Sequence, residues 1–185
     1  VIEVIKHDII NFFVPVWSTE HRSKAIEGEK AVETAFSVEE EPDALVITTD
    51  SLIIRVGSDF CVDIYNSDKE PLLCDYRGPV TEIQRLSEKA IALIEAEGHD
   101  ASGMKEKSHK LVTRKCLDPD DCIYGLGDKT GFLNKRGYEY ENWNSDNPQA
   151  HTEDFHALYK SIPFLMCKKK HGVYGVFFDN TFHSY

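Results

Sequence analysis

No stretch of the sequence approaches the roughly 18–20 uninterrupted apolar residues that a membrane-spanning helix needs. Basic residues are also few relative to acidic ones: 21 Lys and Arg stand against 32 Asp and Glu, for a formal net charge of −11. A surface of that sign is repelled by nucleic-acid phosphates and by anionic lipids. We therefore expect no membrane and no nucleic acid as partner.

Cysteine pairs are missing as well. The five cysteines are an odd number without C-x-x-C spacing, and they are Cys61, Cys74, Cys116, Cys122 and Cys167. A disulfide framework or a zinc site needs closer pairs or flanking histidines. Cys116 and Cys122 could meet across a turn, but scattered reduced thiols fit the spacing better. Reduced thiols favour a cytoplasmic location.

What the sequence does contain is short apolar runs rich in β-branched and aromatic residues. Three of them, Ala44–Thr48, Leu52–Val56 and Phe60–Tyr65, are separated by polar turn residues, which predicts a meander of strands. Similar runs lie at Val1–Ile5, Ile9–Trp17 and His109–Lys115. Short strands at this spacing in a chain of 185 residues predict one antiparallel β-sandwich or barrel. Its core is expected to include Phe164, Val173, Val176 and Phe178.

After Thr81 the apolar period changes to that of a helix. The apolar residues on the predicted face are Ile83, Leu86, Ala90, Leu93 and Ile94. Thr81 and Gln84 have the spacing of a capping box, and Gly98 is a suitable C-terminal stop. We therefore expect one inserted helix around 81–97. Its apolar stripe would pack on the sandwich or dock on another part of a larger protein.

Two motifs suggest ligand chemistry but have the wrong spacing. The glycines at 125, 127 and 131 form G-x-G-x-x-x-G, whereas a dinucleotide fingerprint needs G-x-G-x-x-G ahead of a helix. Tight turns that require positive φ explain them better. In the segment HTEDFH, His151 and His156 fall on different faces of a helix or strand, so we expect a solvated loop and no metal site. No metal or organic cofactor is predicted.

The most informative segment is Tyr124–Pro148, YGLGDKTGFLNKRGYEYENWNSDNP, which combines glycine turns, five aromatic residues and a polar loop. It is followed by LYKSIPF at 158–164 and GVYGVFFDN at 172–180. In this order the motifs resemble those of the N-terminal β-sandwich domain of family 31 glycoside hydrolases, the α-glucosidase and α-xylosidase group. Asp128 stands where that family usually has Glu.

The resemblance implies a galactose-mutarotase-like supersandwich over residues 1–185, a single N-terminal domain whose catalytic (β/α)8 barrel is absent from this chain. The family's nucleophile lies in a W-x-D-M-N-E-like motif on that barrel, and the sequence contains no such motif. The sequence also has no initial Met and stops after an apolar, strand-like run. We therefore expect a fragment without catalytic residues of its own, whose parent is a retaining glycosidase that works through two carboxyls.

The candidate substrate-binding residues lie in the loop 142–148, NWNSDNP. The resemblance gives Asp146 a hydrogen bond to the sugar on the leaving-group side, with Trp143 and Asn144 beside it. A carboxylate accepts two hydroxyl protons and an indole offers an apolar face, which suits an α-linked oligosaccharide. The alternative is that Asp146 only forms an Asx-type turn before Pro148. The expected partners are such a sugar and the parent's own barrel.

Two other functions remain open. A stand-alone carbohydrate-binding module would need an exposed aromatic platform, for which Trp143, Tyr138 and Tyr140 are the candidates. An aldose mutarotase on the same sandwich would need a His and a Glu that face one sugar. The histidines in a strand-like context are His7, His109 and His183.

Overall fold

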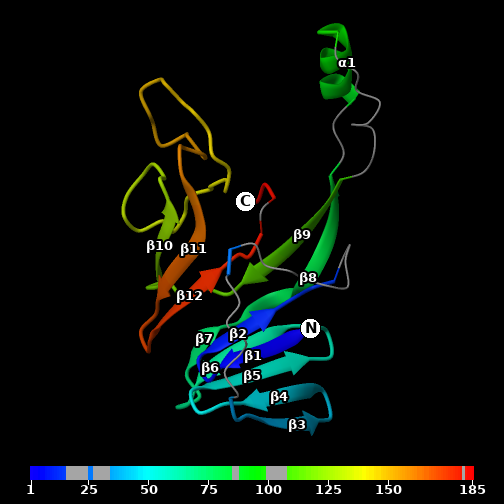
Figure 1. Ribbon diagram of the computed structural model, residues 1–185, viewed down its shortest axis with the longest axis vertical. Coiled ribbons are helices and arrows are strands. Elements are labelled where there is room, and N and C mark those ends of the chain that lie inside the picture. Colours follow the sequence, from blue (N-terminus) through cyan, green and yellow to red (C-terminus); the bar gives the residue numbers. More distant parts are fainter. Residues whose placement is uncertain (16–24, 27–33, 85–87, 99–107, 181) are drawn as a thin grey trace.

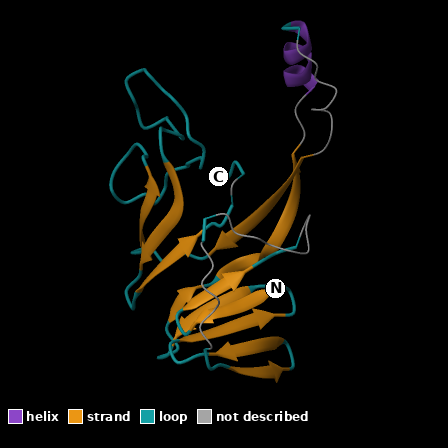
Figure 2. Ribbon diagram, viewed as in Figure 1, coloured by secondary structure: helices purple, strands orange, loops and turns teal. Residues whose placement is uncertain are grey.

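The computed structural model describes residues 1–15, 25–26, 34–84, 88–98, 108–180 and 182–185. Over these residues the protein is mostly antiparallel β-sheet with one short helix, as the sequence predicts (Figures 1 and 2). The strands are β1 (Ile2–Lys6), β2 (Ile9–Phe12), β3 (Ser37–Glu41), β4 (Ala44–Thr48), β5 (Leu52–Gly57), β6 (Val62–Asn66), β7 (Pro71–Leu73), β8 (Asp75–Gln84), β9 (Ser108–Lys115), β10 (Cys122–Gly127), β11 (Ser161–Lys168) and β12 (Val173–Phe177), and the helix is α1 (Glu88–Ala96).

A five-stranded meander, in the order β3-β4-β5-β6-β7, forms one end of the molecule (Figure 1). Two of the predicted strands coincide with β4 and with most of β5, whereas the third begins at Val62 and not at Phe60. The sequence does not predict β3, because Ser37–Glu41 carries three consecutive glutamates and only one apolar residue, and every position of the strand is exposed. Charged side chains of this kind on an edge strand hinder pairing with another chain.

The core lies between this meander and the β1–β2 hairpin. Ile47, Ile54 and Ile64 are buried on three neighbouring strands, and the register places Ile54 opposite both of the others. The partly buried side chains that pack against this row are Ile2, Val4, Ile10, Leu45, Leu52, Val56, Val62 and Leu73. The Thr49 hydroxyl joins the two layers by donating to the carbonyl of His7 over 2.5 Å.

β8 and β9 form a long ribbon that carries α1 at its far end, away from the five- and three-stranded sheets (Figure 1). The predicted helix is confirmed, but its predicted start near Thr81 is wrong. It begins at Glu88, because residues 81–84 belong to β8 and pair with β9. Thr81 and Gln84 are therefore strand residues and form no capping box. Gly98 has a φ of +84°, which fits its role as C-terminal stop.

In the described part of the chain, α1 does not pack on the sandwich (Figure 1). Leu93 is 62% exposed, and the ribbon holds the helix clear of the other sheets (Figure 1). Leu86, which the helical pattern also includes, lies outside the described residues, as does Trp17 at the end of a predicted strand. No helix in the described ranges is long and apolar enough to cross a bilayer.

The three-stranded sheet β10-β11-β12 presents an apolar face to solvent. The exposed large side chains on β11 and β12 are Ile162, Phe164, Met166, Val173 and Phe177. Phe164 pairs with Phe177 across the two strands, so both point to the same face. The expectation that Phe164, Val173 and Phe178 are core residues is therefore wrong for this chain, where they are 43%, 57% and 38% exposed. Val176, on the opposite face of β12, is half-buried.

Candidate functional site

Two glycine turns at the end of β10 precede the segment that leads to the candidate loop 142–148. Gly125 and Gly127 have φ of +108° and +82°, as the turn interpretation of the motif predicts. A Cβ on Gly125 would lie 2.7 Å from the carbonyl oxygen of Phe164, and one on Gly127 would lie 2.5 Å from that of Lys160. These glycines let β10 lie close against β11, which fixes where the following residues start.

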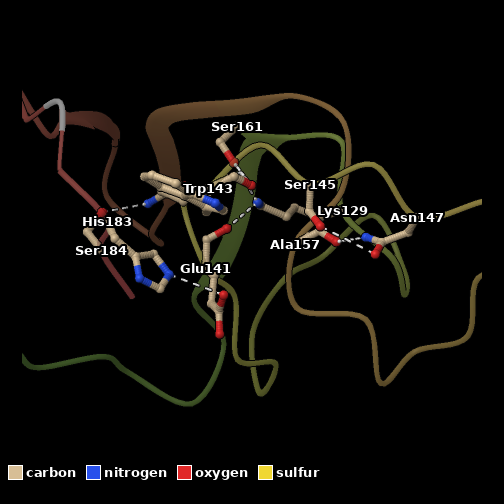
Figure 3. Close-up of polar contacts among 10 residues, drawn as sticks. Lys129, Glu141, Trp143, Ser145, Asn147, Ala157, Ser161, His183 and Ser184 are labelled. Atoms are coloured by element: carbon tan, nitrogen blue, oxygen red, sulfur yellow. Dashed lines mark hydrogen bonds and ion pairs between the residues drawn. The ribbon is translucent and has the colours of Figure 1, made fainter. Parts of the chain in front are cut away.

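The residues from Glu141 to Asn147 are held at almost every position (Figure 3). The Glu141 amide donates to the carbonyl of His156 over 2.9 Å, and the Asn142 amide donates to that of Ser184 over 2.7 Å. Ser161, at the start of β11, donates its hydroxyl to the carbonyl of Trp143 over 2.9 Å. The loop is therefore fixed to β11, to the neighbouring loop and to the C-terminal residues.

Asn147, the residue directly before Pro148, is held by residues outside the loop. The Asn147 side-chain amide donates to the carbonyl of Ala157 over 2.9 Å, and its own carbonyl accepts from the Tyr159 hydroxyl over 2.7 Å. Asp146 is exposed, and its carboxylate has no hydrogen bond or ion pair with any residue in the described part of the chain. The carboxylate is thus available to a ligand.

Asn144 and Trp143 differ in the contacts that their side chains make within the protein. The Asn144 side-chain oxygen accepts from the Ser161 amide over 2.8 Å, so it also holds the loop on β11. Trp143 is 54% exposed, and its ring centroid lies 5.4 Å from that of His183. Of the three predicted residues, Trp143 and Asp146 present groups to solvent, and Asn144 has a structural contact.

Sequence reasoning missed the contribution of the last residues to this site. His183 Nε2 lies 3.1 Å from a carboxylate oxygen of Glu141 (Figure 3), and the rings of His183 and Tyr185 are 5.1 Å apart. Lys110, on β9, lies 4.4 Å above the Tyr185 ring. No local pattern relates residues this far apart in the sequence, so only the folded chain shows that His183 lies against Trp143 and that Tyr185 and Lys110 follow in the same row of contacts.

Comparison with known proteins decides the family. The whole chain, residues 1–185, matches the family model of the glycosyl hydrolase 31 N-terminal galactose mutarotase-like domain. The chain belongs to this domain family. The resemblance that the motifs suggest is thereby confirmed.

Similar proteins include whole enzymes of the same group. The domain is 29% identical to Alpha-glucosidase 2 of Bacillus thermoamyloliquefaciens over 160 residues, which cover 85% of this chain and 19% of that protein. A dextranase of glycoside hydrolase family 31 from Flavobacterium johnsoniae, solved with isomaltotriose, is 27% identical with a TM-score of 0.65, over 98% of this chain and 20% of that one. A family 31 α-xylosidase from Xanthomonas citri shares the fold, at 18% identity and a TM-score of 0.62, over 90% of this chain and 16% of that one. The chain thus spans about a fifth of the length of these relatives or less.

Several described carboxyls of this glycosyl hydrolase 31 domain have surroundings that favour their ionised form. Asp118 and Asp121 both contact the ammonium of Lys169, at 2.8 Å and 2.6 Å. Each described carboxyl with a shifted pKa, namely Asp59, Glu82 and Asp121, has that pKa lowered. A general acid near neutral pH needs a raised pKa, so these groups are suited to ion pairs and hydrogen bonds.

The remaining motifs have structural partners. The ring nitrogen Nε2 of His151 lies 2.8 Å from the carbonyl oxygen of Asn147. In the described ranges no group of three or more His, Cys, Asp or Glu residues is placed to hold a metal ion. Tyr140 is buried and donates its hydroxyl to the carbonyl of Thr130 over 2.8 Å, and its ring stacks on that of Tyr138. The two tyrosines therefore brace the turn and do not extend an exposed platform around Trp143.

Proposed function

We propose that this chain is the N-terminal domain of a retaining glycoside hydrolase of the α-glucosidase type, and that its loop 142–148 contributes to the leaving-group side of the substrate site. The observation that carries the proposal is the contrast within the loop. Its backbone is fixed by hydrogen bonds at Glu141, Asn142, Trp143 and Ser145, while the Asp146 carboxylate and the Trp143 ring are exposed. A rigid loop with an unused carboxylate is suited to binding, because little ordering entropy is lost.

The two exposed groups match the chemistry of a sugar. A carboxylate accepts hydrogen bonds from two adjacent hydroxyls, and the face of an indole packs on the C–H groups of a pyranose ring. An α-linked glucose oligosaccharide is the ligand class that we propose. Relatives named as an α-glucosidase and as a dextranase solved with isomaltotriose support this choice.

The chemistry itself is proposed to lie in a (β/α)8 barrel elsewhere in the parent protein. There one carboxylate would attack the anomeric carbon and a second carboxyl would protonate the leaving oxygen and then activate water. The apolar face of β11 and β12, with Ile162, Phe164 and Met166 exposed, is proposed to pack on that remaining part. This occupant is favoured because the chain spans about a fifth of the length of its relatives, and because large exposed apolar faces mark protein contacts.

The two rival functions have less support. A stand-alone sugar-binding module would use several exposed aromatic rings, but only Trp143 of the three candidates is exposed, since Tyr140 is buried. A mutarotase would direct a His and a Glu at one sugar, whereas His183 and Glu141 contact each other at 3.1 Å. A cytoplasmic location remains our proposal, supported by five free thiols.

Replacing Asp146 by Asn in the parent enzyme tests the proposal. The amide keeps the shape of the side chain but removes the charged acceptor. We expect kcat/KM for disaccharides to fall roughly ten- to a hundredfold, the effect of losing a charge-assisted hydrogen bond of about 1.5–3 kcal/mol. Aryl glycosides, whose leaving group offers no hydroxyl, should be affected less.

The matched control is Asp68→Asn, because Asp68 is an exposed aspartate in the β6–β7 turn of the meander. It should leave the activity on both substrate classes unchanged. If Asp146→Asn lowers both classes equally and also lowers the melting temperature, the residue is structural and the proposal fails.

A further inference from the structure

Lys129 follows the glycine turn that ends β10 and contacts the residue directly before the loop 142–148, here called the substrate loop. Its ammonium donates to the carbonyl of Glu141 over 2.6 Å and to the hydroxyl of Ser161 over 3.3 Å (Figure 3). Ser161 in turn donates that hydroxyl to the carbonyl of Trp143. One ammonium therefore connects β10, β11 and both ends of the segment 141–143.

The surroundings of Lys129 disfavour the charged form of its side chain. The side chain is half-buried, and both of its acceptors are neutral oxygens. Burial lowers the pKa of Lys129, although the negative charges of Glu141 and Asp128 oppose that shift. A lysine that only covered apolar surface would extend its ammonium into water, whereas this one directs it at the loop backbone.

We infer that Lys129 is a positioning residue, which sets the Trp143 ring and the Asp146 carboxylate relative to β11 by fixing the backbone at Glu141 and Trp143. The inference rests on the proposed role of the loop in substrate binding. Lys129 itself would not touch the sugar. Its effect is transmitted through Ser161 and through the two carbonyl groups.

The second half of the loop is held by hydrogen bonds that do not involve Lys129. The Ser145 amide donates to the carbonyl of Leu158 over 3.0 Å, and Asn147 is tied to Ala157. These bonds remain when Lys129 is lost, so the loop should loosen at its first half and not detach. A shift of about 1 Å at a positioning group is enough to cost up to roughly a hundredfold in rate.

Hydrogen–deuterium exchange of the whole parent protein is the first test, because it requires no activity. In Lys129→Met, the hydrogen-bonded amides of Glu141 and Asn142 should exchange roughly tenfold faster, while the Ser145 amide and those of the five-stranded meander should keep their protection. Ser161→Ala removes only the relay hydroxyl and should produce a smaller change at the same amides. This second variant keeps the test valid if Lys129→Met folds poorly.

The matched control is Lys115→Met. Lys115 is another partly exposed lysine, on β9, where its ammonium lies 2.5 Å from the carboxylate of Asp75. Its loss should lower the melting temperature without faster exchange at Glu141 and Asn142. Unchanged exchange at those amides in both Lys129→Met and Ser161→Ala overturns the inference.

Kinetics then separate positioning from general stability. We expect Lys129→Met to raise KM for disaccharides more than it lowers kcat, and to lower the disaccharide-to-aryl-glycoside ratio of kcat/KM roughly tenfold. Lys115→Met should leave that ratio unchanged. Faster exchange with an unchanged ratio would confirm the anchoring by Lys129 and reject the proposed substrate role of the loop. A fall in both substrate classes by the same factor as in Lys115→Met would overturn the positioning role.

Discussion

Asp121 is a buried carboxylate whose ionisation should be visible in the pH dependence of stability. Burial alone would raise the pKa of Asp121, but hydrogen bonds from the Lys169 ammonium and the Asp118 amide outweigh it and lower the pKa from 3.8. The contribution of the pair is therefore complete above about pH 4 and is lost as the pH falls below 3.8 through the native pKa.

The corresponding variant is Asp121→Asn. At pH 7 it should lower the free energy of unfolding by roughly 1.5–3 kcal/mol, because a charge-assisted hydrogen bond between nearly inaccessible side chains is removed. Denaturation between pH 7 and pH 2.5 should show the difference from wild type shrinking as the wild-type carboxylate is protonated. A difference that stays constant across this range would contradict the ionised pair.

The neighbours Asp146 and Asn147 show what can be read from sequence at the scale of single residues. Both residue types form turns before proline, so the sequence leaves the turn and substrate interpretations of Asp146 open. The structure gives Asn147 a partner in the carbonyl of Ala157 and shows Asp146 exposed, while the substrate role of Asp146 stays a prediction. His183 illustrates the same limit, because its contact with Glu141 joins residues that no local pattern relates.

At the scale of elements, the apolar face of the three-stranded sheet gives a prediction for the parent protein. Phe164 is 43% exposed in this chain. If another part of the parent covers it, Phe164→Ala should cost about 3–5 kcal/mol of stability there, as for a core aromatic residue. Val38→Ala, at a 51% exposed position on β3, should change stability by less than about 0.5 kcal/mol. Equal small effects, measured by chemical denaturation, would show that the face stays open.

Elements with strong local signals are the ones that the sequence predicts. β4 and β5 are short, nearly continuous apolar runs between clear turns, and their predicted bounds agree with the structure to within a residue. The start of α1 is missed because Thr81 and Gln84 fit a helix cap locally, while their pairing with β9 keeps them in β8. β3 is missed because its stability comes from pairing with β4. Its sequence has no alternating apolar pattern from which a strand could be predicted.

At the scale of the whole molecule, we expect the 185-residue chain to show no turnover of aryl α-glucosides. Glycoside hydrolysis needs a carboxyl kept protonated near neutral pH opposite a second, ionised one. The described carboxyls that have shifted pKa values, Asp59, Glu82 and Asp121, all have the pKa lowered. The assay is run beside the intact parent at equal molar concentration. Activity that copurifies with the chain through several columns would mean that the catalytic pair has been overlooked.

The order of strands in the two larger sheets has a consequence for how the chain folds. In the meander each strand pairs with the next one along the chain, so only short loops must close and these contacts should form early. β10 can pair with β11 only after residues 128–160 have been enclosed between them. This enclosed segment contains the whole loop 142–148, for which we propose a substrate role. The loop should therefore be among the last parts to become protected during refolding, and a slow or misdirected closure would leave a molecule with a native meander and an unformed loop.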